Sequence, residues 1–320
     1  MATTFTDTGV TYAGEFAGKY ISAALLSGST LANNEITIMP NVKFKEVVQN
    51  VATGNLISSA SCDFTDSSSI TLTERVIEPS ELQVNLEVCK SSFLNNWQAL
   101  EMGFSAHHEL PQSFEDFMIA HVAEKVAEEI EKNIWQGDTA GSAPVNHFDG
   151  FEKLIDAVTP GGEITAATVT AANVVDELGK IVDAIPSAVY SKTDLKVYVS
   201  SNIARAYQRA LGGFAALQNV AGTENVSDRG GNGYLGQGLV GRKPMNFDGV
   251  DLVMCPGLAD NTAIATPSSN LFFGTGLLND HNEVRVIDMA QYDGSQNVRI
   301  IMRMTAGVQF GVAGDIVLYN

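Results

Sequence analysis

Positive charge is scarce in this chain. Its 320 residues include 19 lysines and arginines against 37 aspartates and glutamates, which gives a net charge of −18 at neutral pH. Such a surface repels phosphate backbones, so it argues against a protein that reads nucleic-acid sequence. The excess of acid fits simple solubility, and it also fits a surface that must lie near DNA without retaining it.

Cysteines are few, and long apolar runs are absent. Cys62, Cys89 and Cys255 are far apart and odd in number, so we expect free thiols in a reducing compartment. No run of 18 apolar residues occurs, so we expect no membrane span. The first twenty residues contain no basic stretch followed by an apolar one, so we expect no signal peptide.

Catalytic and cofactor motifs are scarce as well. Gly231-x-Gly233-x-x-Gly236 matches a dinucleotide-binding fingerprint in its letters, but it lies in a glycine-rich loop without a preceding strand or a following helix. No nucleophile elbow and no phosphate-binding loop of the Walker type occurs. The five histidines have no metal-ligand spacing: His107, His108, His121, His147 and His281. We therefore expect no catalytic residue, no cofactor, no metal and no enzymatic activity.

What the chain does contain is one long amphipathic segment. Residues 113–136 predict a helix of about 22 residues, roughly 33 Å long, which suits a structural spine. Ser113 is expected to cap its start, and Gly137 to end it in the left-handed conformation. The apolar face of this helix is expected to comprise Phe114, Phe117, Met118, Val122, Val126, Ile130 and Ile134.

The other side of the same helix is charged. Glu128 and Lys132 have the spacing of a favourable ion pair along a helix. We expect a solvated face here, with an inter-subunit role as the alternative. The charged residues of this face are Glu124, Lys125, Glu128, Glu129, Glu131 and Lys132.

Two strand-like stretches joined by a polar tip precede the helix. Residues 35–48 and 70–88 are β-like, and Pro79 interrupts the second stretch. A two-stranded ribbon is marginal in water by itself, so this one must find a partner surface. We expect its inter-subunit contacts to come from Val42, Phe44, Leu56, Phe64, Ile70 and Leu72.

The remaining segments suggest an arm and an inserted α/β unit. Residues 1–35 form the arm, with a short helical patch at 15–26. Residues 168–183, 195–199 and 201–212 read as helix, strand and helix, and residues 214–240 as a loop. The later apolar strands are natural partners of the long helix, so one domain would be built from two distant segments. These strands are expected at 250–254, 271–273, 284–289, 298–304 and 308–318.

In this order, the parts resemble the major capsid proteins of tailed bacteriophages, which have the HK97-like shell fold. The stretch Ile130–Asp138 is similar to the end of that family's long helix, and Ile185–Tyr190, followed by a strand and Ser200-Ser201-Asn202, is similar to its axial domain. The resemblance implies an α+β fold with five parts. These are an N-terminal arm (1–35), an extended β loop with flanking strands (36–90), a peripheral domain with the spine helix (91–165), an axial α/β domain (166–280) and peripheral C-terminal strands (281–320).

The resemblance also implies a function. The chain would be the major capsid protein of a tailed double-stranded-DNA bacteriophage, made in the host bacterial cytoplasm and located in the virion. Its copies would form hexamers and pentamers of an icosahedral shell, with the loop and the arm lapping over neighbours. Portal, scaffold and decoration proteins, and packaged DNA held without sequence-specific contact, are the other implied partners, and no membrane is. The arm is too short for the cleaved scaffolding segment of some relatives, which implies a separate scaffold protein or an already processed chain.

Two other functions remain open from the sequence. One is an encapsulin-type compartment shell, which has the same fold and holds a protein cargo instead of DNA. The other is an α/β enzyme whose site is assembled from His107, His108 and distant acidic residues. Deletion of residues 45–75 separates these functions, because it would abolish assembly of a shell and be mild for an enzyme with a peripheral loop.

Overall fold

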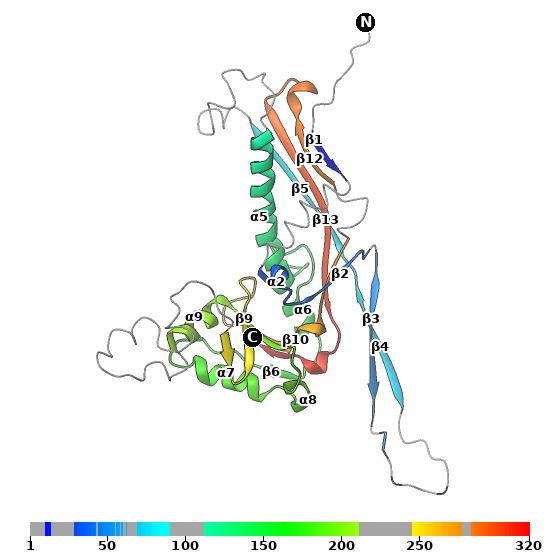
Figure 1. The fold of residues 1–320 in the computed structure, drawn as a ribbon, viewed down its shortest axis with the longest axis vertical. Helices are drawn as coiled ribbons and strands as arrows, with labels where there is room; N and C mark the ends of the chain where they lie inside the picture. Colours follow the sequence, from blue (N-terminus) through cyan, green and yellow to red (C-terminus); the bar gives the residue numbers. More distant parts are fainter. Residues whose placement is uncertain are drawn as a thin grey trace, which may run out of the picture.

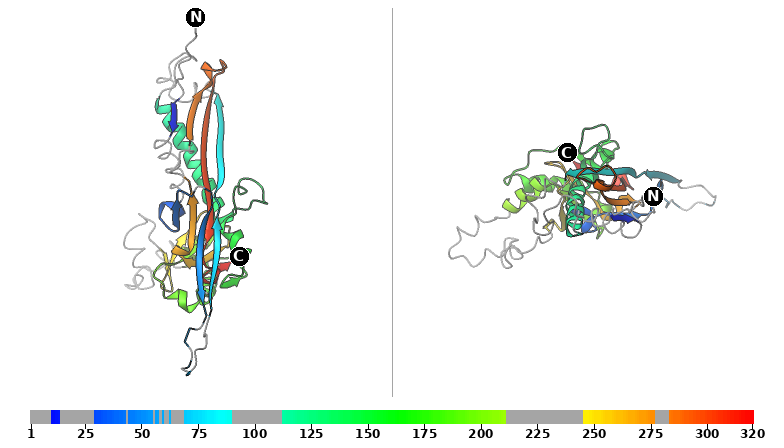
Figure 2. Two further views of the ribbon diagram at one scale, coloured as in Figure 1. Left: turned by 90° about the vertical axis from the view of Figure 1, so that its right-hand side faces the viewer. Right: turned by 90° about the horizontal axis from the view of Figure 1, so that it is seen from above.

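The protein is an elongated α+β molecule with a projecting ribbon. The computed structural model describes residues 10–13, 29–42, 44–54, 56, 57, 59, 62, 69–89, 112–210, 245–276 and 283–320. A long helix and a long antiparallel sheet form one body, a smaller α/β body lies at one end of it, and a two-stranded ribbon projects beside them (Figures 1 and 2). Among the helices in these ranges, none combines the length and the apolar character that crossing a bilayer requires.

Helix α5, Gln112–Gln136, is the long helix that the sequence predicts over 113–136. Its row of Val122, Val126, Ile130 and Ile134 is buried, as the four-residue repeat predicts. Ile119 and Trp135 widen the buried face, and both are 0% exposed. The helix is therefore packed along two adjacent rows of side chains and not along a narrow seam.

The start of α5 differs from the prediction. Ser113 lies inside the helix, one residue after its first residue, so the prediction that Ser113 is the N-cap is wrong. Phe114, Phe117 and Met118 belong to the first turns of α5. Their side chains lie outside the described part of the structure, so their place on the apolar face stays a prediction.

Gly137 follows the helix for a reason other than the predicted one. Its φ is not positive, so the left-handed C-cap is wrong. A Cβ at this position would lie 2.2 Å from the carbonyl oxygen of Phe148 and 2.4 Å from that of Asn133. The N–H of Gly150 also donates to the carbonyl of Gly137 over 2.8 Å. Glycine is therefore needed here because another stretch of backbone passes too closely for a side chain.

The large sheet is organised around one strand, β13 (Asn297–Phe310). One edge of β13 pairs with β12 (Glu283–Asp288) and β11 (Leu271–Thr275), and the other edge pairs with β5 (Ser80–Cys89), all antiparallel. β1 (Val10–Ala13) extends the sheet beyond β12. β2 (Thr37–Pro40) extends it beyond β11 in parallel orientation. Figure 1 shows β13 running through the length of this body.

The core beneath this sheet joins distant parts of the chain. Side chains of α5 share one apolar cluster with residues of β11, β12 and β13. The pairing of the long helix with the late apolar strands, which the sequence predicts, is confirmed by this cluster. The sequence predicts two separate strands at 298–304 and 308–318, but residues 297–310 form one continuous strand.

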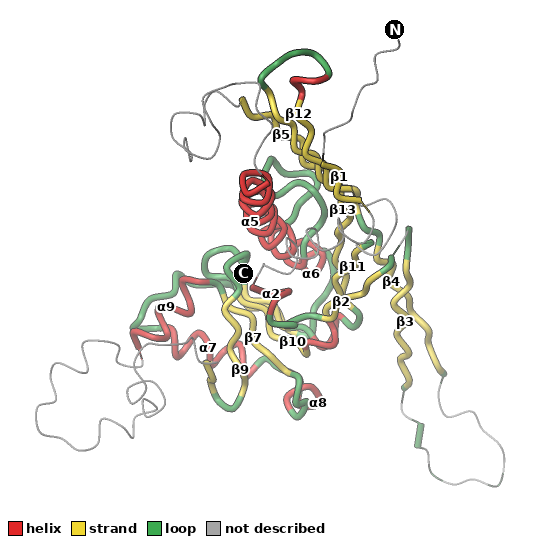
Figure 3. Tube along the Cα trace, turned by 45° about the horizontal axis from the view of Figure 1, so that its top comes forward, coloured by secondary structure: helices red, strands yellow, loops and turns green. Residues whose placement is uncertain are grey.

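The smaller body has its own sheet and its own core. The strand order is β6 (Gly162–Ile164), β14 (Val317–Tyr319), β10 (Ala263–Pro267), β7 (Leu195–Val199), β9 (Val250–Met254) and β8 (Met245–Phe247). Helices α7 (Val174–Asp183) and α9 (Ser201–Ala210) pack beside it (Figure 3). Asp248 and Gly249 both have positive φ, which suits the two-residue turn that joins β8 to β9.

Several boundaries differ from the predicted parts. Strand β14, which the sequence assigns to the C-terminal strands at 281–320, pairs with β10 and β6 in the α/β sheet. β6 falls in the predicted peripheral part at 91–165 and also joins this sheet. β11 falls in the predicted axial part at 166–280 but joins the large sheet. Strand partners are set by non-local pairing, which local patterns do not contain. The other boundaries stay a prediction.

Short elements connect these parts. The β-like stretch predicted at 35–48 is two strands in different sheets, β2 and β3 (Glu46–Thr53). The helix predicted at 168–183 begins later than predicted, at Val174.

The remaining elements are β4 (Ile70–Ile77), α2 (Ser29–Ala32), α6 (Phe151–Asp156), α8 (Ser187–Tyr190) and the 3₁₀ turns Ser268–Asn270, Met289–Gln291 and Ala313–Asp315. The predicted helical patch at 15–26 and the glycine-rich loop at 214–240 lie outside the described residues.

Candidate interaction surface

The ribbon consists of β3 and β4, and it projects beside the two bodies (Figure 1). The strands are antiparallel, with Val47 opposite Val76 and Val51 opposite Leu72. Side chains opposite each other point to the same face, and successive side chains alternate between faces. The side chains described on one of these faces form what we call the apolar face of the ribbon: Val47, Gln49, Val51, Ile70, Leu72, Glu74 and Val76.

This face is open to solvent. Val51 is 58% exposed, Ile70 66% and Leu72 70%. Twelve large apolar side chains are exposed in the described part of the chain, and eight of them lie between residues 44 and 76. Single exposed apolar residues are ordinary on a soluble protein, but a cluster on one element marks a binding surface.

The opposite face of the ribbon turns toward the molecule at its base. Ile77 is 0% exposed, and the guanidinium carbon of Arg75 lies 4.0 Å from the ring centroid of Phe310, a cation–π distance. The side-chain amide of Gln309 donates to the carbonyl of Val76 over 3.0 Å. These contacts attach the base of the ribbon to the end of β13, while the apolar face points away from it.

Two of the six predicted contact residues, Ile70 and Leu72, lie on the ribbon itself, and Phe44 and Leu56 lie in the segments next to β3. Phe44, Leu56, Ile70 and Leu72 are exposed. Val42 is 3% exposed, and its N–H donates to Thr275, so the prediction that Val42 forms an inter-subunit contact is wrong.

Phe64 lies outside the described residues, and other exposed residues are missing from the sequence-based set. These are Val47, Val51 and Val76 on the ribbon and Ile57 just after β3. The strand register would have indicated three of them, because Val47, Val51 and Val76 share a face with Ile70 and Leu72. A hairpin register fitted to the apolar alternation would have found them.

The charged side of α5 divides into an exposed and a buried part. The ion pair between Glu128 and Lys132 is present at 2.9 Å, as predicted, and Lys125 joins it at 3.0 Å. Glu131 is 5% exposed, so its assignment to the solvated face is wrong.

Glu131 holds the start of α2 against the long helix. The N–H of Thr30 donates to Oε2 of Glu131 over 3.2 Å, and the Thr30 hydroxyl donates to Oε1. The indole N–H of Trp135 donates to that hydroxyl over 3.1 Å. Burial raises the pKa of Glu131, and the Thr30 donors oppose this shift. The carboxyl group thus joins a distant segment to the spine and does not face a substrate.

A second carboxyl group lies at the contact between the bodies. Glu152, on α6, accepts the N–H of Ala259 over 3.1 Å, from the loop between β9 and β10. Burial raises the pKa of Glu152 to about 7, and the Ala259 bond only partly opposes this shift. Among the described residues, Glu152 belongs to no group of histidine, cysteine, aspartate and glutamate side chains that is placed to hold a metal ion.

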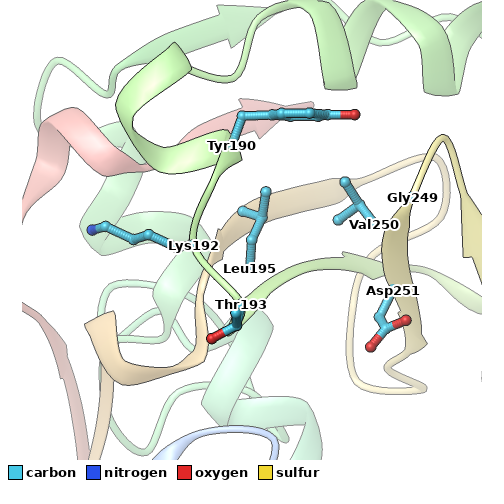
Figure 4. Close-up of a pocket in the computed structure, with 7 residues that line it drawn as sticks. All are labelled: Tyr190, Lys192, Thr193, Leu195, Gly249, Val250 and Asp251. Carbon is cyan, nitrogen blue, oxygen red and sulfur yellow. The ribbon is translucent and has the colours of Figure 1, made fainter.

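The pocket in Figure 4 is small. Its volume is about 120 Å³, and its lining residues are Tyr190, Lys192, Thr193, Leu195, Gly249, Val250 and Asp251. Figure 4 shows Leu195 and Val250 beneath the ring of Tyr190, with Lys192 pointing away. The hydroxyl of Tyr190 donates to the carbonyl of Asp248, and Lys192 pairs with Asp315. The hydroxyl of Tyr190 and the ammonium group of Lys192 therefore already have partners within the chain.

The histidines give no sign of a metal centre in the part of the chain that can be described. Within those residues, no group of three histidine, cysteine, aspartate or glutamate side chains is placed to hold an ion. His121 and His147 are exposed. His107, His108, His281 and the Gly231–Gly236 motif lie outside the described residues.

Comparison with known proteins identifies the fold. No protein-family model and no curated protein sequence matches this chain. Solved capsid structures do match. One, from the satellite phage P4 procapsid with its size determination (Sid) protein, has 12% identity and a TM-score of 0.56 over 94% of this chain and 98% of that one. The capsid of the native GTA particle has 14% identity and a TM-score of 0.57, over 93% of this chain and 89% of that one. The capsid of cyanophage P-SCSP1u has 11% identity and a TM-score of 0.51, over 91% of this chain and 88% of that one.

These matches cover nearly the whole chain and nearly the whole of each capsid protein. The likeness therefore extends over almost the full length of the chain and is not confined to one of its bodies. The chain has the α+β HK97-like capsid fold, as its resemblance to that family implied. At identities this low, the comparison shows a shared fold only, and any function has to be argued from the chain's own surfaces.

Proposed function

We propose that this chain is a structural shell protein, the major capsid protein of a tailed double-stranded-DNA bacteriophage. The observation that carries the proposal is the ribbon: a marginal two-stranded element that exposes an apolar face on a molecule with the capsid fold. A shell subunit needs such an element, because many modest contacts between copies add up to a stable lattice.

The partners follow from this role. Copies associate into hexamers and pentamers through the α/β body, and the ribbon laps over a neighbour. Portal, scaffold and decoration proteins complete the particle, whose place is the virion and whose site of synthesis is the host bacterial cytoplasm. Packaged DNA lies in the lumen without sequence-specific contact, since a net charge of −18 per copy gives phosphate little to bind. No enzymatic activity belongs to this proposal.

The test is the mass of the protein in solution. The chain is expressed with and without a candidate scaffold protein, sized by chromatography with light scattering, and imaged by negative-stain electron microscopy. We expect hexamers, pentamers, sheets, tubes or hollow shells, and particle size then separates a virus shell from an encapsulin-type compartment. A monomer under both conditions contradicts the proposal and favours a soluble α/β enzyme.

A deletion variant makes the test specific. Replacing residues 45–75 by a short glycine-serine turn removes the ribbon and leaves both cores intact. We expect a folded chain, with the circular dichroism of a mixed α+β protein, that no longer assembles. Assembly that survives the deletion would show that the ribbon is not the element that joins the copies.

A further inference from the structure

Residues 29–42, which we call the strap, run across the joint between the two bodies. They comprise α2, β2 and the turn between them, and Figure 1 shows α2 beside the end of α5. The N–H of Thr30 donates to Oε2 of Glu131 over 3.2 Å, which ties the strap to α5. Lys196 of β7 pairs with Glu35 over 2.5 Å, which ties the strap to the α/β body. One short segment therefore holds both bodies.

The joint beneath the strap is centred on Trp135, near the end of α5. The ring centroid of Trp135 lies 5.2 Å from that of Tyr198 on β7 and 5.4 Å from that of Phe151 on α6. Leu31 and Ile36 of the strap belong to the same apolar cluster, and they are 1% and 3% exposed. The strap therefore supplies part of the core that joins the two bodies.

The strap is built to open separately from the two sheets. Among the described strands, β2 pairs with β11 alone, over four residue pairs at the edge of the large sheet. Helix α2 has four residues, which is too short for a helix to be stable by itself. Short edge elements open at lower free energies than the interior of a sheet. The strap can therefore leave the joint while both sheets stay intact.

A buried carboxyl group holds α2 in place. Glu131 accepts the N–H and the hydroxyl of Thr30, and it accepts the hydroxyl of Ser29 over 3.4 Å. Burial raises the pKa of Glu131 above its ordinary value of 4.5, and the donors of the strap oppose this shift only in part. A raised carboxyl pKa contributes stability below about pH 4.5 that is lost as the pH rises through the raised value. The docked strap therefore favours the protonated carboxyl group.

The charges near Glu131 do not cancel this effect. The titratable groups of the elements around it are Glu35 of the strap, Lys196 and Tyr198 of β7, Cys255 after β9, and Glu128, Glu129 and Lys132 of α5. Lys196 is paired with Glu35, and Lys132 is paired with Glu128. Burial raises the pKa of Tyr198 and of Cys255, so both groups stay neutral.

We propose that the strap is a latch on the joint between the two bodies and that the Glu131 carboxyl group is its catch, which holds the strap when protonated and releases it when charged. Release removes the ties through Thr30 and Glu35, so the angle between the bodies is less constrained. It also loosens the segment that leads into β3. This inference goes beyond the proposed shell function and does not depend on it, because the latch is measured on the unassembled chain.

Hydrogen exchange on the full chain tests the latch. Protection factors, from which the intrinsic pH dependence of exchange has been divided out, are measured by mass spectrometry for peptides from the strap and from β7. The series runs from about pH 4.5 to about pH 8, and every chain carries Glu152→Gln because Glu152 titrates in this range. We expect protection of the strap to fall as the pH rises, by at most about tenfold per pH unit, because one proton is lost. Protection of β7 should stay constant.

Two variants assign this effect to the catch. In Glu131→Gln the amide oxygen can still accept the N–H of Thr30 but the side chain does not titrate, so protection of the strap should be independent of pH. Glu129→Gln, on the exposed side of α5, is the matched control and should follow the parent. Thr30→Val keeps the shape of the side chain and removes the hydroxyl bond to Glu131. We expect it to lower protection of the strap about tenfold at about pH 5, and the exposed Thr193→Val to change nothing.

Three results would overturn the latch. Equal protection of the strap and β7 at every pH would mean that the strap opens only when the whole chain unfolds. The same pH profile in the parent and in Glu131→Gln would mean that another group is the catch. Protection of the parent strap that is flat or rises with pH would contradict the proposal without any variant, so the test does not depend on the folding of Glu131→Gln.

Discussion

The carboxyl group of Glu152 lies where α6 meets the loop between β9 and β10. Its pKa in the folded chain is about 7, against an ordinary value of 4.5, because burial disfavours the charged form. A raised carboxyl pKa contributes stability that is complete below about pH 4.5 and is lost as the pH rises through about 7. The contact between the two bodies is therefore weaker in alkaline solution.

Glu152→Gln tests this contribution. The amide oxygen of glutamine can still accept the N–H of Ala259, but the side chain no longer titrates. We expect the free energy of unfolding of the parent to fall by roughly 1–3 kcal/mol between about pH 5 and about pH 8, relative to the variant. Denaturant melts at a series of pH values measure this difference. Glu129→Gln, the same change on the exposed side of α5, serves as the control. Parallel pH profiles for parent and Glu152→Gln would contradict the buried carboxyl as the cause.

Some residue-level features lie beyond what the sequence can reveal. In the sequence, Glu131 cannot be told apart from the exposed glutamates of α5. It is buried because it binds Thr30, which lies about 100 positions earlier in the chain. The position of Val42 in a β-like stretch predicts an exposed contact residue, but its side chain is buried and its N–H donates to the carbonyl of Thr275, at the end of β11. In both cases a non-local neighbour decides the burial, and a local pattern carries no record of that neighbour.

At the scale of elements, the end of α5 offers a matched pair of substitutions. Gly137→Ala places a Cβ 2.2 Å from the backbone of Phe148, so α5 or the loop after it must move. We expect a loss of about 2 kcal/mol or more in the free energy of unfolding. Gly179→Ala, in the interior of α7, meets nothing within 4 Å. It should stabilise the chain by about 0.5–1 kcal/mol, since alanine has less freedom to lose in a helix.

Chemical denaturation of the two variants beside the parent gives both signs in one experiment. If Gly137→Ala were as stable as the parent, the contact between the end of α5 and the following loop would have to be looser than the distances indicate. If Gly179→Ala were destabilising, α7 would have a neighbour at that position that the described residues do not include.

The sequence predicts regular elements well where one period runs without interruption. The four-residue repeat of Val122, Val126, Ile130 and Ile134 placed α5 to within one residue at its start. The prediction divides β13 into two strands around Gly307, which interrupts the apolar pattern, whereas in the structure a Cβ at Gly307 would meet the backbone of Glu78 and Pro79 that crosses there. Three-residue strands such as β14 carry too little pattern to name a partner, so their sheet was assigned wrongly.

The order of the elements carries more information than any one motif. The ribbon, the long helix, the α/β unit and the late strands follow one another in this chain, and together they have the HK97-like fold at about 12% identity. Two separate cores explain why such an order persists at about 12% identity. Each core needs only apolar side chains of suitable volume, so most individual residues can change while the arrangement stays.

At the scale of the whole molecule, charge and apolar surface oppose each other in assembly. Copies with a charge of −18 repel at low ionic strength, where screening extends over about 30 Å. At about 0.15 M salt the screening length falls to about 8 Å, and contact through the apolar face of the ribbon meets less resistance. We therefore expect the assembled fraction to rise with salt, as measured by light scattering at constant protein concentration.

The direction of this salt effect separates two kinds of lattice. Contacts made by ion pairs between copies weaken as salt screens them, whereas contacts made by Val51, Ile70 and Leu72 do not. The chain with Val51→Glu and Leu72→Glu is the control: it carries more charge on the contact face, so salt should restore only part of its association. A fall in assembly with rising salt would mean that charged groups, and not the apolar face, join the copies. The ribbon would then owe its exposed side chains to some other partner.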